Sequence, residues 1–340
     1  NIRSESTADL ILTSGTGGEV KAVELSHSNI LASARNINEY LGTSYQDVEV
    51  LALPLAHSFG LGRLRCCLLA GASVVLMSGF VPPRRLLNAL SDTSATGFSL
   101  VPTAWRILQR TSGERFKELD GHLRYLELGS SWMSAAEKNE MACLFPSTRV
   151  IMHYGCTEAS RATFLDLHND GRKLSTVGKA SPMAEVRIMS EDGETLSTGS
   201  EGEVCVSGPM VSGGYFNDSS RNVEAFHGAW FRTGDLGVMD DEGYLTLTGR
   251  VSEMLDVAGR KFSLHEVDLA LISIPEILDA ACVGLPDAMA GNRVRAFVVW
   301  SDKRLTDGEV TRKLSQRIEQ HKVQEGFYAK YFLRRVRVVL

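Results

Sequence analysis

Hydrophobic residues in the first half of the chain gather in short runs of the kind that form buried strands. These runs occupy 48–53, 73–77, 96–101, 123–128 and 149–154. Other segments repeat apolar residues every three or four positions, as helices do, at 26–42, 84–90 and 105–109. In the first of these, Ser26 is suited to cap a helix that Gly42 ends. Strands alternating with helices predict an α/β fold with a mostly parallel sheet, where ligands bind at the carboxyl ends of strands.

The pattern changes from about residue 177 onward. Short strands separated by Gly- and Asp-rich turns, at 186–189, 202–206 and 244–248, predict a small antiparallel β unit. A mixed tail follows, with helices expected at 264–272 and 308–320 and strands at 280–285 and 295–300. We therefore expect a large domain over residues 1–251 and a smaller, mobile α+β C-terminal domain over 252–340.

Composition narrows the range of functions. The 340 residues are 44% hydrophobic and 23% charged, as in ordinary globular proteins, and the net charge of −5 offers no basic field for nucleic acid. The longest apolar stretch, 66–77, is too short for a transmembrane helix. Six scattered cysteines without CxxC spacing favour a cytoplasmic protein over a disulfide framework or a zinc site. The first residue is Asn1 rather than Met, which suggests a fragment or a processed chain.

The most informative motif is the loop Thr-Ser-Gly-Thr-Gly-Gly-Glu-Val-Lys at 13–21, directly after the apolar run 10–12. Its glycines allow a close approach to backbone N–H groups, and its hydroxyls and lysine add donors suited to a polyanion. It is not a Walker loop, because Lys21 is followed by Ala22 rather than Ser or Thr. Taken alone, the loop could also be a tight surface turn.

Three further motifs follow in order: Tyr-Gly-Cys-Thr-Glu at 154–158, Phe-Arg-Thr-Gly-Asp at 231–235 and Gly-Arg at 249–250. Together with the first loop, they resemble the adenylate-forming superfamily of acyl- and aryl-CoA synthetases, luciferases and peptide-synthetase adenylation domains. The resemblance spans nearly the whole chain. The first loop departs from the family pattern at Gly17, Val20 and Ala22, where threonine, proline and glycine are usual.

The resemblance implies an ATP site with Mg²⁺. Glu158 is expected to bind the metal and Thr157 the α-phosphate, with Asp235 on the ribose and Arg250 nearby. The residues expected to surround the phosphates are Thr13, Ser14, Gly15, Thr16, Gly17 and Lys21; those against the adenine are Gly129, Ser130, Ser131, Tyr154 and Gly155. Considered singly, Glu158 could be a solvated loop charge, Asp235 part of a plain turn and Arg250 a surface residue. Gly259 is expected to line a tunnel for a thiol arm.

The segment 53–60 resembles the family's substrate pocket, with His57 near the acyl group, although a single histidine is more often structural. Relatives that activate amino acids usually carry an aspartate here, and no acidic residue lies between Val50 and Met77. A buried ammonium without a carboxylate is costly, so a small acyl or aryl carboxylic acid is favoured over an amino acid.

The resemblance implies two steps: formation of acyl-AMP with release of pyrophosphate, then transfer to a thiol, with CoA favoured. Lys21, His57, Thr157 and Glu158 are the expected catalytic residues. An adenylation unit that loads the phosphopantetheine of an acyl carrier protein and a non-catalytic nucleotide- or acyl-binding relative are the alternatives. The family's N-terminal segment and late Gly-Lys motif are not found, so we expect an incomplete chain that adenylates poorly.

Overall fold

The computed structural model describes residues 3–14, 20–257, 260–287, 291–300, 305–306, 308–310, 312–313 and 337–339. The chain forms two compact units. The first comprises residues 1–233 and 237–247, and the second comprises 234–236 and 248–340.

A seven-stranded sheet forms the centre of the first unit, in the order β4-β3-β5-β6-β7-β8-β9. Pairing is parallel from β4 to β7 and antiparallel for β8 and β9. The strands are β3 (Val48–Leu51), β4 (Ser73–Leu76), β5 (Gly97–Leu100), β6 (Tyr125–Leu128), β7 (Arg149–Tyr154), β8 (Thr163–Asp166) and β9 (Lys179–Ala180). The expected mostly parallel α/β sheet is confirmed.

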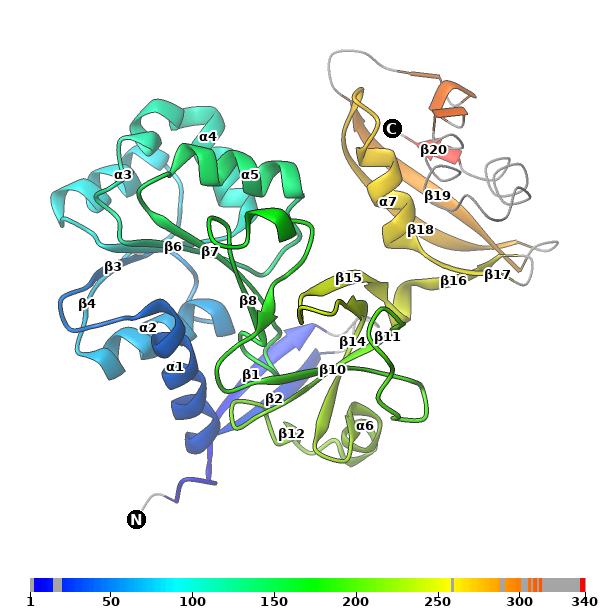
Figure 1. Ribbon diagram of the computed structural model, residues 1–340, viewed down its shortest axis with the longest axis horizontal. Helices are drawn as coiled ribbons and strands as arrows, with labels where there is room; N and C mark the ends of the chain where they lie inside the picture. The colour runs from blue at the N-terminus through cyan, green and yellow to red at the C-terminus, as the bar shows by residue number, and fades with distance from the viewer. Residues whose placement is uncertain are drawn as a thin grey trace. The chain divides into compact units, whose positions relative to one another are not determined.

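Helices cover both faces of this sheet (Figure 1). On one face lie α3 (Pro83–Asp92), α4 (Pro102–Lys117) and α5 (Ala135–Leu144), packed on an apolar core that includes Trp105 and Leu126. On the other lie α1 (His27–Leu41) and α2 (Ser58–Ala70). Helix α1 begins and ends as expected, because the Ser26 hydroxyl accepts from the Asn29 N–H and Gly42 adopts the left-handed conformation with φ 65°.

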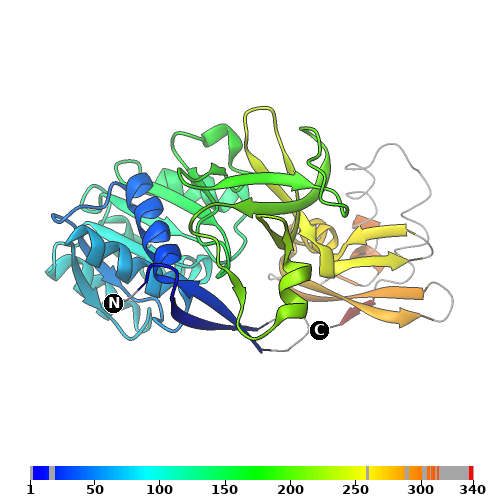
Figure 2. The same cartoon turned by 90° about the horizontal axis from the view of Figure 1, so that it is seen from below.

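A separate three-stranded antiparallel sheet, ordered β1-β2-β12, carries the first loop. Strands β1 (Thr7–Ser14) and β2 (Val20–Ser26) form a hairpin that lies beside α1, as Figure 2 shows, and β12 (Gly214–Tyr215) pairs with β2. Strand β2 was not among the strands expected from the sequence. Its Glu24 and Lys21 interrupt the apolar run, so the strand follows from its pairing with β1.

The antiparallel β unit expected after residue 177 is present, with the strand order β10-β11-β14-β13 and β15 paired to β14. The helices and strands of this region are the 3₁₀ helix η1 (Gly171–Lys173), β10 (Glu185–Met189), β11 (Glu201–Ser207), α6 (Ser219–Ala225), β13 (Phe226–His227), β14 (Trp230–Met239) and β15 (Leu245–Arg250). Its small core contains Ile188, Val204 and Leu245.

The second unit contains a β hairpin, a helix and a second small sheet. The short 3₁₀ helix η2 (Val251–Glu253) leads into β16 (Met254–Val257), which pairs with β17 (Arg260–Ser263), and α7 (Leu264–Ile272) follows. Strands β18 (Ile277–Asp287) and β19 (Gly291–Trp300) are antiparallel, and β20 (Arg337–Val339) runs parallel to β19. Helix α7 packs on this sheet through Val267 and Leu271. The helix expected at 308–320 lies largely outside the described residues.

The predicted boundary between residues 251 and 252 stays a proposal. The first compact unit ends at Leu247, and residues 234–236 of strand β14 group with the second unit. No helix in the described part of the chain is both long and apolar enough to cross a membrane.

Candidate nucleotide site

The β1–β2 hairpin fixes both ends of the first loop. Thr13 lies opposite Lys21 in the antiparallel register, and Ser14 lies opposite Val20. The Thr13 Oγ1 atom is buried without a hydrogen-bond partner among the described residues. A buried hydroxyl without a partner is costly, so Thr13 retains a donor for a bound group. The loop residues Gly15, Thr16 and Gly17 and the Ser14 side chain lie outside the described part of the structure.

Lys21 and Glu158 meet directly, although 137 positions separate them in the sequence. The Lys21 ammonium donates to Glu158 Oε1 at 2.7 Å and to the Tyr215 hydroxyl at 2.8 Å. The Tyr215 hydroxyl in turn donates to the same Glu158 Oε1 at 2.7 Å. We call these three residues the Lys21 cluster. It joins the base of the first loop to the motif at 154–158, as the resemblance to the superfamily leads one to expect.

Backbone hydrogen bonds hold Glu158 in place. Cys156 N–H donates to the Ala159 carbonyl at 3.1 Å and closes a turn, while Ser212 N–H donates to the Glu158 carbonyl at 2.8 Å. The Glu158 side chain is only 6% exposed, whereas Lys21 is 20% exposed. Burial alone raises the pKa of Glu158, but the hydrogen bonds and charge of Lys21 and the Tyr215 hydroxyl outweigh it, so the pKa is lowered. Glu158 is therefore an ionised carboxylate at neutral pH.

The residues present fit a magnesium site completed by a nucleotide. No group of three or more His, Cys, Asp or Glu side chains within the described ranges is arranged to hold a metal ion unaided. Mg²⁺ commonly takes only one or two carboxylates and completes its shell with water and phosphate oxygens. Lys21 and Tyr215 both engage Oε1 of Glu158, so they leave Oε2 unengaged by either. A single ionised carboxylate next to the phosphate loop meets this requirement.

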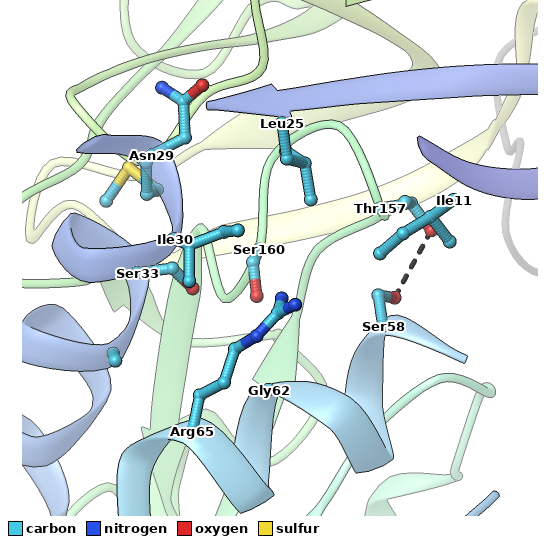
Figure 3. A pocket seen from close by; sticks show the side chains of 12 residues that line it. Ile11, Leu25, Asn29, Ile30, Ser33, Ser58, Gly62, Arg65, Thr157 and Ser160 are labelled. Atoms are coloured by element: carbon cyan, nitrogen blue, oxygen red, sulfur yellow. Dashed lines mark hydrogen bonds between the residues drawn. The ribbon is translucent and has the colours of Figure 1, made fainter. Parts of the chain in front are cut away.

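Thr157 lies next to the start of helix α2, at the wall of a small pocket. Its Oγ1 lies 3.2 Å from Ser58 Oγ, and Figure 3 shows this pair at the wall of the pocket. The pocket encloses about 410 Å³, including its open mouth, and α1, α2 and the hairpin contribute to its lining. Arg65 from α2 also lines it and is ion-paired with Asp9. His57 precedes α2 as its N-cap residue, without a side-chain capping bond.

A fully buried set of charges underlies the same region, on the face of the sheet that α2 covers. Glu127 Oε1 lies 3.1 Å from Arg161 Nε and 2.8 Å from His153 Nδ1, and Arg63 lies 2.9 Å from Glu49. The Arg63 Nε atom is also 3.4 Å from Glu127 Oε2. We call these five residues the Glu127 cluster.

The protonation states of this cluster follow from burial and charge. Burial raises the pKa of Glu127, but Arg161 and His153 outweigh it, so the pKa lies well below its usual range. Burial and the charge of Arg161 lower the pKa of His153, which is therefore neutral at pH 7. Two carboxylates thus face two arginines, and no net charge is left in the interior.

The Glu127 cluster also supports the proposed adenine loop and substrate segment. The His153 ring packs edge-on against Phe59, with centroids 4.6 Å apart, and the Arg161 guanidinium lies 4.7 Å from the centre of the Phe59 ring. A Cβ atom added at Gly129 would come within 2.0 Å of His153 Nε2. Gly129 therefore has to be glycine while His153 occupies this position.

Tyr154, Gly155 and Ser130 belong to the first unit, whereas Asp235 and Arg250 belong to the second. Tyr154 ends strand β7, Gly155 follows it, and Ser130 adopts a positive φ of 72°. In the second unit, Arg250 Nε lies 2.7 Å from Asp235 Oδ1, so these two predicted ribose residues are neighbours. Gly259 lies outside the described residues. The individual roles expected for these residues stay proposals.

Sequence reasoning missed three contributors. The sequence assigned no role to Tyr215 or to the Glu127 cluster, and it included Ser58 only as part of the segment 53–60. An available signal was Glu49 and Glu127, each a carboxylate within a largely apolar strand run, which indicates a buried partner. No comparable signal marks Tyr215, since tyrosine is common in strands.

Comparison with known proteins agrees with this fold. The profile of the AMP-binding enzymes matches residues 1–216, and that of the AMP-binding enzyme C-terminal domain matches 266–335. The acyl-CoA ligase sidI of Aspergillus fumigatus is 29% identical over 96% of this chain and 57% of its own length. A 2-succinylbenzoate–CoA ligase of Bacillus velezensis is 32% identical over 95% of this chain and 65% of its own.

Among solved structures, o-succinylbenzoate coenzyme A synthetase of Bacillus subtilis in complex with ATP and magnesium is similar. Its TM-score is 0.85 at 29% identity, covering 99% of this chain and 67% of that one. This chain and the synthetase conform to one class of two-unit nucleotide-binding folds. The class combines a mostly parallel α/β sheet, an antiparallel β unit and a separate α+β unit. The chain belongs to the AMP-binding enzyme family of the adenylate-forming superfamily. It spans between about half and two thirds of the length of the curated relatives it matches.

Proposed function

We propose that this chain carries the nucleotide site of an acid–thiol ligase of the acyl- or aryl-CoA synthetase type. In this proposal, ATP activates a small carboxylic acid as acyl-AMP with release of pyrophosphate, and the acyl group then passes to the thiol of CoA. The observation that carries the proposal is the direct pairing of Lys21 with Glu158 at 2.7 Å. It joins a phosphate loop to a metal-binding carboxylate.

In this proposal the side chains position the reactants and balance charge rather than supply a nucleophile. Lys21 and the loop hydroxyls hold the β- and γ-phosphates, and Thr157 donates to the α-phosphate. When bound at Glu158, Mg²⁺ would neutralise the negative charge that develops on the phosphate oxygens. The substrate carboxylate then attacks the α-phosphorus, with pyrophosphate as the leaving group.

The charges around α2 support an acid without an α-amine. Beneath the helix, Glu49 and Glu127 are fully buried and already paired with Arg63. Neither can compensate a substrate ammonium, which would be costly to bury alone. We therefore propose an acyl or aryl acid as the substrate, with His57 and Phe59 next to its acyl group.

A panel of carboxylic acids tests this proposal on the protein as it is naturally made. With ATP, Mg²⁺ and hydroxylamine, we expect a hydroxamate from at least one acid, since hydroxylamine traps the adenylate. Addition of CoA should then give the thioester, and a holo carrier protein should be a poorer acceptor. Loading of the carrier in preference to CoA would favour an adenylation unit. ATP binding without adenylate for any acid would favour a non-catalytic relative.

A further inference from the structure

Tyr215 has no role in the proposed reaction, yet its hydroxyl lies at the centre of the site. The residue is only 5% exposed, and its ring packs with Ile11, Val23 and Leu25. A phenylalanine would provide the same packing without introducing a buried hydroxyl that needs hydrogen-bond partners. Packing in the hydrophobic core therefore accounts for the aromatic ring of Tyr215 but not for its hydroxyl.

The backbone around Tyr215 is held unusually well for a two-residue strand. Its N–H donates to Asn222 Oδ1 at 2.7 Å, and Asn222 Nδ2 donates back to the Tyr215 carbonyl at 3.0 Å. The preceding Gly214 has φ 128°, and a Cβ there would come within 2.4 Å of Asn222 Oδ1. These contacts fix the Tyr215 backbone independently of Lys21 and Glu158.

We propose that Tyr215 is a positioning residue, whose hydroxyl holds Lys21 and one oxygen of Glu158 in the arrangement required for Mg²⁺-dependent binding of ATP. The inference rests on the proposed function. The hydroxyl accepts from Lys21 and donates to Glu158, so it orients both partners at once. Because it engages Oε1, it presents Oε2 in a fixed direction.

The charges of the cluster support this role. The Tyr215 hydroxyl donates to the Glu158 carboxylate and accepts from the Lys21 ammonium, so it is the uncharged member between two opposite charges. Lys21 and a metal ion are both attracted to Glu158, and a cation at Oε2 weakens the hold of the carboxylate on the lysine. Tyr215 is the neutral member that retains its geometry when this occurs.

The test is Tyr215→Phe, which keeps the ring and removes the hydroxyl. ATP binding is measured by calorimetry on the protein as naturally made, with Mg²⁺ and separately with EDTA, in the absence of any acid. We expect the gain in ATP affinity on adding Mg²⁺ to fall about tenfold, as for loss of a hydrogen bond to a charged group. ATP affinity in EDTA should change by less than about twofold. A Mg²⁺-dependent gain equal to that of the wild type would overturn the inference.

Tyr244→Phe is the matched control, because the Tyr244 hydroxyl donates to Asp170 at 2.6 Å and the residue is similarly buried. It should lower the melting temperature about as much as Tyr215→Phe and leave the Mg²⁺ effect unchanged. An equal loss of the Mg²⁺ effect in both variants would reduce Tyr215 to a structural role. If the wild type shows no Mg²⁺-dependent ATP binding, the proposed function fails together with the inference.

A double-mutant cycle tests whether Tyr215 acts through Lys21. Residues that share one carboxylate oxygen should be coupled, so Lys21→Met with Tyr215→Phe should cost less in Mg²⁺-dependent affinity than the two single losses combined. Strict additivity would contradict a shared positioning role.

Discussion

Two charged clusters of the first unit differ in how far solvent reaches their side chains. The Glu127 cluster is closed: Arg63, Glu49 and Glu127 have no exposed side-chain surface, and acids and arginines are matched. The Lys21 cluster has one lysine and one glutamate. Lys21 is 20% exposed, and both Lys21 and Tyr215 donate to a single oxygen of Glu158.

The difference separates charges that shape the fold from charges available to a ligand. Ions buried without water must be satisfied by protein, and removing one leaves the others uncompensated. A partly exposed ion pair has a smaller desolvation cost, and its members can exchange their partners for a bound group. Net neutrality is common to both clusters, so charge balance alone does not reveal which one binds ligands.

The largest effect should come from breaking the closed cluster. Arg63→Met leaves Glu49 without its arginine and weakens the compensation of Glu127, and we expect the free energy of unfolding to fall by about 3–5 kcal/mol. Urea denaturation measures this. Arg187→Met is the control, since Arg187 pairs with Glu185 at the surface, 3.5 Å away, and lies 4.4 Å from the centre of the Trp230 ring, so its loss should change stability by only about 1 kcal/mol. Equal effects in the two variants would remove the distinction between the clusters.

The open cluster should instead lose activity. Glu158→Gln removes the charge offered to Mg²⁺ while keeping the shape, so we expect kcat for adenylate formation to fall about 100-fold. The free energy of unfolding should fall by only about 1 kcal/mol, because Lys21 can still reach water. Glu137→Gln is the control, as Glu137 is half-buried and bound to Arg106 at 2.7 Å. Comparable kinetic losses in both variants would contradict the assignment of Glu158.

Lowering the pH should reduce the stability of the fold through His153 of the Glu127 cluster. Its pKa is lowered from 6.5 by burial and by Arg161, so below pH 6.5 the unfolded chain binds a proton that the folded chain does not. Stability from this group therefore falls as pH decreases from 6.5, by up to about 1.4 kcal/mol per pH unit. In His153→Gln this component should be absent, so the decline below pH 6.5 should be shallower than in the wild type; His265, whose pKa burial also lowers, keeps its own contribution in both proteins. Parallel stability curves for wild type and variant between pH 5 and 8 would show that His153 does not contribute.

The smallest effect is expected at the hydrogen bond between Ser58 and Thr157. Ser58→Ala removes a neutral, partly solvated bond, so kcat/KM should fall by less than about fivefold and stability by about 1 kcal/mol or less. Ser197→Ala removes a similar bond to Ser200 at 3.0 Å on the exposed surface and serves as the control. Steady-state kinetics measures the difference. A loss near 100-fold would place Ser58 among the essential groups.

The succession of strands along the first half of the chain and the bounds of the first helix could be predicted, because their signals are local. The cap at Ser26, the stop at Gly42 and the apolar period between them all lie within one segment, and the observed helix has these ends. Helix α7 was likewise expected at its observed bounds. These signals need no knowledge of the rest of the chain.

The clusters could be predicted only in part, because their residues are far apart in the sequence. Motif order predicted Lys21 and Glu158 in one site, but it did not reveal that Tyr215 of strand β12 joins them. Arg63 is an unremarkable position on a helix until the sheet beneath it is known. Hydrogen bonds between distant segments depend on tertiary packing and leave little trace in local pattern.

The contact between Gly129 and His153 has a consequence for how the sequence can diverge. Any side chain at 129 would overlap the imidazole, since its Cβ would lie within 2.0 Å of Nε2. A smaller residue at 153 must therefore arise before, or together with, any replacement of Gly129. The order of substitutions is constrained, and a library randomised at both positions should return large side chains at one position only beside small ones at the other.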